Sequence, residues 1–166
     1  ICDIPVAVSH WAKANGIHTR WTCLEISETA CKIGRNYIIR NNAKEIQLVH
    51  TNIFNYQPDQ TFDLAVGSMF FHHFDNDSII AIGRKIREFG CKRLLINDLY
   101  RSKLNYYSCS AISFLLSPKI KHDALISITK GFRQAELHDL LKNMTPRKIE
   151  TDTSWYCRIT GTAVWQ

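Results

Sequence analysis

The sequence predicts an α/β fold with a mostly parallel β-sheet that ends in an antiparallel pair of strands. Short apolar runs alternate with segments whose apolar residues recur at helical spacing, which is typical of a parallel sheet covered on both faces. The last two strand-like runs, 148–153 and 155–165, have no helix between them, which favours antiparallel pairing. With 166 residues, 45% of them apolar, the chain can bury one sizeable core, so we expect a single domain over residues 1–166.

Charge and cysteine content weigh against several function classes. The net charge is 21 − 15 = +6, and the basic residues interleave with apolar ones, which favours solvated helix faces over a nucleic-acid groove. No apolar run approaches the roughly 20 residues of a membrane span, and no charged-then-apolar leader opens the chain. The six cysteines have no C-x-x-C spacing, which suits reduced thiols better than disulfides or zinc ligands. We therefore expect a cytoplasmic protein without a metal site.

The first predicted element is a helix that begins almost at once. Asp3 is a suitable N-cap residue, and Pro5 suits the first turn. Gly16 would follow the end of this helix. The side chains expected on its apolar face are Val6, Ala7, Trp11 and Ala14.

A strand, a helix and a second strand are expected next, over residues 19–26, 27–40 and 46–50. Ser27 is a good N-cap for the helix. The helix side chains expected to point inward are Ile33, Tyr37 and Ile38. The second strand leads into Thr-Asn-Ile-Phe at 51–54.

The most informative stretch runs from residue 61 to residue 74. Residues 62–66 are mostly apolar and predict a buried strand, which Gly67 and Ser68 would end. Apolar side chains and two imidazoles then precede a helix: Met69, Phe70, Phe71, His72 and His73. In open α/β sheets ligands bind where strands deliver their carboxyl ends, so this connection predicts one wall of a ligand site. Two adjacent histidines cannot face the same way on a helix, so at most one should face a ligand.

The remaining elements are predicted by spacing and by capping residues. We expect helices over 77–89, 102–116 and 133–142 and a strand over 93–96, whereas the segment 119–131 is ambiguous. The first of these helices is preceded by the capping residues Asp75-Asn76-Asp77 and followed by Gly90. The strand delivers Asn97 and Asp98 at its end.

Polar side chains thus recur at the predicted strand ends. Glu25 alone would be an ordinary helix-capping or solvated residue, and Asn52 alone an ordinary turn residue. In combination they are more specific, because a carboxylate can accept both hydrogens of a ribose diol. A small polar side chain in the position of Asn52 can meet the edge of an adenine.

The order of several motifs resembles that of class I S-adenosylmethionine-dependent methyltransferases, most of all the bacterial small-molecule group. The motifs are Asp-Ile-Pro, Leu-Glu-Ile-Ser, Thr-Asn-Ile-Phe, Phe-Asp-Leu-Ala, Phe-Phe-His-His-Phe and Leu-Ile-Asn-Asp-Leu-Tyr-Arg-Ser. The resemblance covers nearly the whole chain and is strongest over 62–102. It implies a three-layer Rossmann-like methyltransferase fold, S-adenosylmethionine as cofactor, and methyl transfer to an oxygen, nitrogen or carbon of a small molecule such as a phenolic or polyketide-like acceptor. The aromatic helix 102–116 could close over that acceptor.

The resemblance also implies roles for individual residues. Glu25, with Ile26 beside it, would hold the ribose hydroxyls. Asn52 would meet the adenine together with Ile53, and Asn52 stands where the family more often has Asp. The residues that would line the methionine part of the cofactor are Ser68 and Met69, and those that would follow the family's glycine-rich turn are Asp3, Ile4 and Pro5. The catalytic base would be His73, with His122 as the reserve candidate.

One feature of the family has no counterpart in this sequence. The first strand and its Asp-x-Gly-x-Gly-x-Gly turn are missing, since the first glycine is Gly16. We therefore expect a strand that ends in this turn directly before Ile1. Two alternatives stay open. The +6 charge is compatible with an RNA methyltransferase, and the missing turn is compatible with an inactive nucleotide-binding or interaction module.

Overall fold

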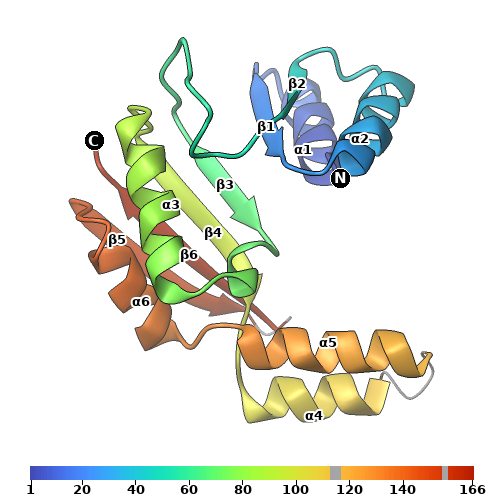
Figure 1. Cartoon of the computed structure of the whole chain (residues 1–166), viewed down its shortest axis with the longest axis vertical. Helices are drawn as coiled ribbons and strands as arrows, with labels where there is room; N and C mark the ends of the chain where they lie inside the picture. The colour runs from blue at the N-terminus through green and yellow to red at the C-terminus, as the bar shows by residue number, and fades with distance from the viewer. Residues whose placement is uncertain (113–116, 155–156) are drawn as a thin grey trace. The chain divides into compact units, whose positions relative to one another are not determined.

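The computed structural model describes residues 1–112, 117–154 and 157–166. Its backbone forms two compact units, Ile1–Gln57 and Pro58–Gln166 (Figure 1). Each unit combines helices with β-strands, so the predicted α/β class is confirmed. The single domain over 1–166 and the three-layer arrangement stay predictions.

The first unit contains two helices and a two-stranded parallel sheet. Its elements are α1 (Asp3–Ala14), β1 (Trp21–Glu25), α2 (Glu28–Arg40) and β2 (Ile46–His50). The strands pair from Trp21 opposite Ile46 to Glu25 opposite His50. A small core of Val6, Ala43 and Ile46 packs against Trp21, Cys23 and Ile38. The parallel pairing places the carboxyl ends of β1 and β2 side by side.

The start and the inward face of α1 differ from the prediction. The N-cap is Cys2, in a left-handed conformation and without a capping side-chain bond, so Asp3 is the first helical residue and not the cap. The buried residues are Val6, Ser9 and Ala12, whereas Trp11 is 61% exposed. Val6 packs in one core with Ala43 and Ile46. The face of α1 that carries Val6 therefore points inward, and Trp11 lies outside it.

The cap of α2 is confirmed, but most of its predicted inward side chains are not. The Ser27 hydroxyl accepts the Ala30 N–H at 3.3 Å. Ile33 and Tyr37 are exposed, while Cys31 and Gly34 are buried. A Cβ at Gly34 would lie 2.7 Å from a methyl group of Leu48, so the small residue lets α2 approach β2 closely.

The second unit is built on a four-stranded mixed sheet in the order β3-β4-β6-β5. Its elements are β3 (Ala65–Ser68), the 3₁₀ turn η1 (Phe71–His73), α3 (Asn76–Glu88), β4 (Arg93–Leu99), α4 (Lys103–Ile112), α5 (Pro118–Lys130), α6 (Gln134–Lys142), β5 (Lys148–Ser154) and β6 (Arg158–Val164). Strands β3 and β4 are parallel, and β6 is antiparallel to both β4 and β5. The predicted antiparallel C-terminal pair is therefore confirmed.

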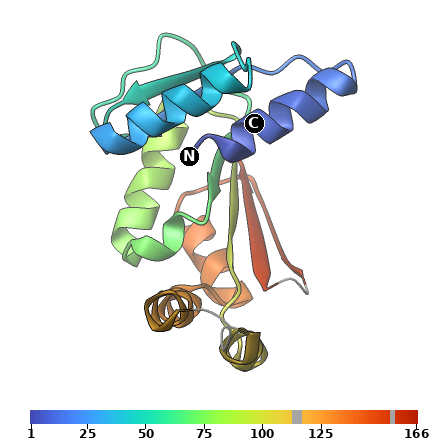
Figure 2. The same cartoon turned by 90° about the vertical axis from the view of Figure 1, so that its right-hand side faces the viewer.

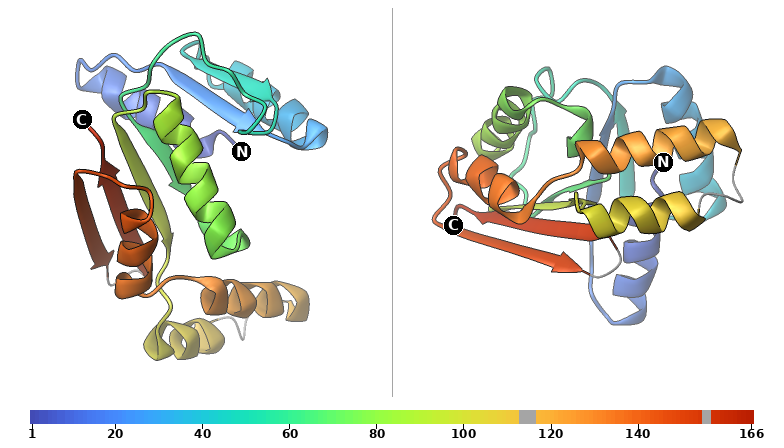
Figure 3. Two further views of the ribbon diagram at one scale, coloured as in Figure 1. Left: turned by 60° about the vertical axis from the view of Figure 1, so that its left-hand side comes forward. Right: turned by 90° about the horizontal axis from the view of Figure 1, so that it is seen from below.

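Helices α3 and α6 lie on the same side of this sheet (Figure 2). The strand residues that face them alternate with half-exposed ones, as the buried Leu94 and Ile96 of β4 and Ile159 of β6 illustrate. Asp98 follows the same alternation and is fully buried at the end of β4. Helices α4 and α5 lie side by side as a separate pair (Figure 3).

Strand β3 begins and ends later than predicted, and β4 begins at Arg93 as predicted but ends later. Gly67 and Ser68 do not end β3 but lie inside it, because they pair with Ile96 and Asn97. A Cβ at Gly67 would overlap the Phe71 ring, so glycine here serves side-chain packing and not a chain break. Asn97 and Asp98 likewise lie within β4, which continues to Leu99.

The later helices agree with the predictions in type. The ambiguous segment 119–131 forms α5, and the predicted helix over 133–142 is α6. Residues 113–116 of the predicted helix over 102–116, and residues 155 and 156 of the last predicted strand, lie outside the described residues. No helix in the described part of the chain is long and apolar enough to cross a membrane. All six cysteines are free thiols.

Candidate functional site

The candidate site in the second unit is the connection from Met69 to His73, which follows the carboxyl end of β3 (Figure 1). The Met69 N–H donates to the Asn97 carbonyl at 2.9 Å, so pairing with β4 reaches the start of the connection. Met69 has a φ of 51°, in the left-handed region, and the chain turns sharply there. Phe71 to His73 then form η1, whose Phe71 ring is buried against Gly67.

A single buried carboxylate organises this connection. Asp98 Oδ2 accepts the backbone N–H groups of Phe70 at 3.3 Å, Phe71 at 2.9 Å and His72 at 3.2 Å. Asp98 Oδ1 accepts the Leu99 N–H at 2.8 Å and lies 2.6 Å from His72 Nδ1. The side chains of His72 and Asp98 are 2% and 0% exposed, so this network is almost dry.

The network determines which nitrogen of His72 carries hydrogen. Every backbone contact of the Asp98 carboxylate brings an N–H group to it, so the carboxylate acts as an acceptor throughout. His72 Nδ1 is therefore the donor in the 2.6 Å contact. This bond fixes the ring orientation of His72 inside the protein.

His73 has the opposite environment to its neighbour. It is exposed, and its ring centroid lies 4.0 Å from that of His72. Partial desolvation of the ring lowers the pKa of His73 below 6.5. The nearby His72 and Lys130 lower this pKa further, and Asp98 opposes them. One histidine of the pair is thus buried and tied, while the other presents a ring that is neutral at neutral pH.

The rim of this connection is soft and aromatic. Met69, Phe70 and Phe74 are 37%, 41% and 40% exposed, and the rings of the two phenylalanines lie 4.8 Å apart. Nη1 of Arg158, the first residue of β6, contacts the Met69 sulfur. Asn97 Nδ2 lies 3.4 Å from the Ser68 hydroxyl. These groups suit an apolar or aromatic ligand with a few polar atoms.

The first unit holds the other predicted cofactor residues. The Thr51 N–H donates to the Glu25 carbonyl at 2.9 Å, so the ends of β1 and β2 lie together. Glu25 Oε1 accepts the Ser27 N–H at 2.8 Å, and Asn52 Oδ1 accepts the Phe54 N–H at 2.9 Å. The structure therefore brings Glu25 and Asn52 to one edge of the two-stranded sheet.

The remaining predicted residues lie on or beside these elements. Ile26 is 70% exposed after β1, and Ile53 is half-buried next to Asn52. The first turn of α1 holds Asp3, Ile4 and Pro5. His122 is exposed in the first half of α5.

The sequence prediction missed the role of Asp98. It placed Asp98 at a strand end but assigned it no partner. A signal was present, because Asp98 follows Leu94 and Ile96 at the period of two residues that a strand requires for one face. A carboxylate on a buried face needs donors, and the nearest chain at that edge is the connection after β3.

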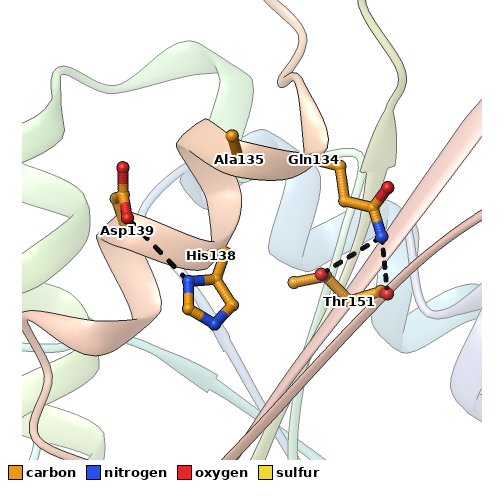
Figure 4. Close-up of a pocket in the computed structure, with 5 residues that line it drawn as sticks. All are labelled: Gln134, Ala135, His138, Asp139 and Thr151. Atoms are coloured by element: carbon orange, nitrogen blue, oxygen red, sulfur yellow. Dashed lines mark hydrogen bonds and ion pairs between the residues drawn. The ribbon is translucent and has the colours of Figure 1, made fainter.

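A surface hollow of about 540 Å³ lies elsewhere, between α6 and β5 (Figure 4). Its lining residues are Gln134, Ala135, His138, Asp139 and Thr151. Gln134 Nε2 donates to the Thr151 carbonyl at 2.9 Å, and His138 Nδ1 lies 3.8 Å from the Asp139 carboxylate. None of the predicted site residues lines this hollow. Among the described residues no group of three or more potential metal ligands is found.

Comparisons with known proteins agree on the fold. No family model and no curated protein matches the sequence. The chain is similar in structure to the S-adenosylmethionine-dependent methyltransferase SibL (TM-score 0.72, 12% identity, covering 99% of this chain and 47% of SibL). It is also similar to the plantazolicin methyltransferase BpumL, crystallised with a triazolic desmethylPZN analogue and S-adenosylhomocysteine (TM-score 0.72, 15% identity, covering 96% of this chain and 72% of BpumL). A third match is the magnesium protoporphyrin IX methyltransferase of Synechocystis, also with S-adenosylhomocysteine (TM-score 0.58, 12% identity, covering 98% and 82%).

These matches define the fold of the chain as that of S-adenosylmethionine-dependent methyltransferases. The chain spans about half the length of SibL, which was crystallised in its apo form, and most of the length of the other two. Sequence identities of 12% to 15% carry the comparison no further than the fold.

Proposed function

We propose that the protein transfers a methyl group from S-adenosylmethionine to a small-molecule acceptor. The observation that carries this proposal is the connection after β3. In a chain with a methyltransferase fold it presents an exposed, neutral imidazole, His73, among exposed apolar side chains. The three-layer Rossmann-like arrangement belongs to the proposal and is supported by the parallel pairings β1–β2 and β3–β4. A cytoplasmic location belongs to it as well, supported by the six free thiols.

The residues at the ends of β1 and β2 fit the nucleoside part of the cofactor. Glu25 uses Oε1 to accept the Ser27 N–H, and its half-buried side chain has a second oxygen for ribose hydroxyls. Asn52 uses Oδ1 to accept the Phe54 N–H, and its amide NH₂ is a donor suited to a ring nitrogen of adenine. Beside these, Ile26 and Ile53 offer apolar contact. The other residues proposed to bind the cofactor are Asp3, Ile4, Pro5, Ser68 and Met69.

The proposed chemistry asks little of the protein beyond positioning. The bound cofactor supplies an electrophilic methyl group on a sulfonium. The protein holds the acceptor oxygen, nitrogen or carbon in line with that group and shields it with apolar side chains. His73 accepts the proton that the acceptor loses, since its ring is neutral near pH 7. His122 is the second candidate for this role.

Calorimetry with S-adenosylhomocysteine tests the proposal. The protein should bind this ligand, and Glu25→Ala should weaken binding by about 1.5–3 kcal/mol, the range for a lost hydrogen bond to a charged group. Glu28→Ala is the matched control, because Glu28 is an exposed carboxylate that pairs with Lys32 2.8 Å away in α2. It should leave the affinity unchanged. Absence of binding to the unmodified protein would reject the function, and equal effects of both substitutions would reject the role of Glu25.

A further inference from the structure

The backbone after β3 forms a concavity that would ordinarily bind an anion. Three successive N–H groups, those of Phe70, Phe71 and His72, converge on one oxygen atom. The left-handed Met69 directly before them turns the chain so that these groups point inward. Such concave arrangements of backbone donors are common anion sites in proteins. Here the anion is supplied by the protein itself, as the Asp98 carboxylate on the neighbouring strand.

We propose that Asp98 is the positioning residue of the candidate site, and that it places His73 by holding the connection from Phe70 to His72. The proposal rests on the proposed function. Asp98 is 0% exposed, so its carboxylate is not open to direct contact with a ligand. Its effect on the reaction therefore passes through the backbone, because His73 directly follows the three residues that Asp98 holds.

His72 has a supporting role in the same network. Its side chain is 2% exposed, so it does not present a free ring to an acceptor as His73 does. Its Nδ1–H is one more donor to Asp98, at 2.6 Å, which ties the ring to the carboxylate that also holds the His72 backbone. The adjacent histidines thus have different roles: His72 completes the hydrogen-bond network of Asp98, and His73 is exposed.

Substitution of Asp98 by Asn would break the network selectively. Asn has nearly the same shape, but it offers only one oxygen, and its NH₂ would face N–H groups on the other side. The donors are divided between the two oxygens, with the residues 70–72 on Oδ2 and with Leu99 and His72 Nδ1 on Oδ1. One of these two groups must lose its acceptor in a buried place, where such a loss is costly.

The first experiment compares Asp98→Asn with Asp152→Asn. Asp152 is an exposed residue of β5 whose Oδ1 accepts the N–H of the next residue at 2.8 Å, as Asp98 does, but it has no contact with the connection. Amide hydrogen exchange should become about 10- to 100-fold faster at residues 70–72 in Asp98→Asn, while the amides of Leu94 and Ile96 stay protected. Asp152→Asn should change none of these rates.

The same variants are assayed for turnover and for affinity toward S-adenosylhomocysteine. In Asp98→Asn, kcat should fall about 5- to 100-fold, and the ligand affinity should change by less than about threefold. The affinity is spared because Met69, the start of the connection, is held by the Asn97 carbonyl and not by Asp98. When both quantities are measured on folded protein, a simple loss of stability would not lower kcat while leaving the affinity for S-adenosylhomocysteine unchanged.

A second pair, His72→Asn and His72→Leu, separates positioning from catalysis. The amide nitrogen of Asn can replace His72 Nδ1 as donor to Asp98, whereas Leu cannot. His72→Asn should keep kcat within about fivefold of the unmodified protein, and His72→Leu should lose about as much as Asp98→Asn. This pair also serves if Asp98→Asn does not fold.

Three results would overturn the inference. They are unchanged exchange at residues 70–72 in Asp98→Asn, faster exchange there with unchanged kcat, and a His72→Asn variant that folds but is as inactive as His72→Leu. The last would make His72 itself catalytic. Failure of the proposed function is recognised separately, since it appears as absent S-adenosylhomocysteine binding in the unmodified protein. In that case the exchange rates still decide whether Asp98 holds the connection.

Discussion

The connection from Met69 to His73 and the helix pair α4–α5 differ in how they are held. The connection holds only one short 3₁₀ turn, yet the backbone N–H groups of residues 69–73 all have acceptors, namely the Asn97 carbonyl, the Asp98 carboxylate and the Phe70 carbonyl. Helices α4 and α5 are regular, but they expose large apolar side chains. The most exposed are Leu104 at 75%, Tyr107 at 68% and Ile120 at 55%.

The described contacts of the helix pair with the rest of its unit gather at one end. Arg101, just before α4, donates to the Thr129 carbonyl near the end of α5 at 3.3 Å and pairs with Glu136 of α6. Asn105 Nδ2 donates to the Tyr100 carbonyl at 2.8 Å. Regular secondary structure and attachment to the sheet are thus separate properties, since the backbone N–H groups of residues 69–72 are all bonded to β4. A catalytic group needs a fixed position.

Each of the two regions holds one candidate base, His73 in the connection and His122 in α5. Substitution of each histidine in turn shows which region supplies the base. His73→Ala should lower turnover about 10²- to 10⁴-fold, the usual contribution of a general base. His122→Ala should stay within about threefold of the unmodified protein, since a residue outside the reacting groups contributes little. Steady-state kinetics with the true acceptor, on variants checked for folding, measures both.

The reverse result would move the catalytic base to α5 and make the fixed connection a structural element only. If both variants stay within about threefold, neither histidine is the base, and catalysis rests on positioning alone.

The environment of His73 predicts a pH dependence. Partial desolvation and the neighbouring His72 and Lys130 lower its pKa below 6.5, against the opposing effect of Asp98. The base is therefore available at neutral pH, and kcat/KM should fall about tenfold per pH unit only at pH values below that pKa. Between that pKa and 6.5 the folded state binds fewer protons than the unfolded chain, so the stability that His73 contributes is lost as pH falls from 6.5 through this range. A pH–rate profile whose acid limb has its midpoint above 6.5 would contradict this assignment.

Two glycines test how tightly each region is packed. A Cβ at Gly67 would overlap the Phe71 ring, and a Cβ at Gly131, after α5, would lie 2.5 Å from the Leu99 carbonyl oxygen. Gly67→Ala and Gly131→Ala should each lower the free energy of unfolding by about 1–3 kcal/mol. Gly131→Ala should cost more, because a backbone carbonyl cannot rotate away as a ring can.

Chemical denaturation measures these two changes, and turnover distinguishes the regions. Only Gly67→Ala should also lower kcat on folded protein, since Phe71 belongs to the connection that leads to His73. Equal kcat in both variants would show that displacement of Phe71 does not reach His73.

The features predicted well from sequence are those with local causes. Ser27 and Asp75 were predicted as caps, and each accepts the N–H three residues later, at 3.3 and 2.7 Å. Strand β2 has the predicted bounds because the run of residues 46–50 is flanked by polar turn residues. Helix α3 buries Ile79, Ile82 and Ile86, and the helical spacing of these apolar residues is what predicts a helix over 77–89.

The features predicted poorly depend on partners distant in sequence. Glycine often interrupts a strand, so the sequence predicts that the strand ends at Gly67. In the structure Gly67 lies within β3, and its lack of a side chain leaves room for the Phe71 ring. The inward face of α1 depends on Ala43 and Ile46, which no local pattern in α1 reveals. For the candidate site, the sequence predicted the connection and its two histidines but not the carboxylate that holds it. The binding and catalytic roles of Glu25, Asn52 and His73 stay predictions.

The smallest expected effect concerns the exposed side chains of the helix pair. Leu104→Ala should change the free energy of unfolding by no more than about 0.5 kcal/mol, as is usual for surface positions. Leu137→Ala is the matched comparison, because Leu137 is 0% exposed in α6 and its loss should cost about 2–5 kcal/mol. Both are read from denaturant midpoints of the same protein. A cost above about 1 kcal/mol for Leu104→Ala would mean that this side chain is covered in solution. The helix pair would then be fixed by contacts along its length, and the contrast with the connection after β3 would be lost.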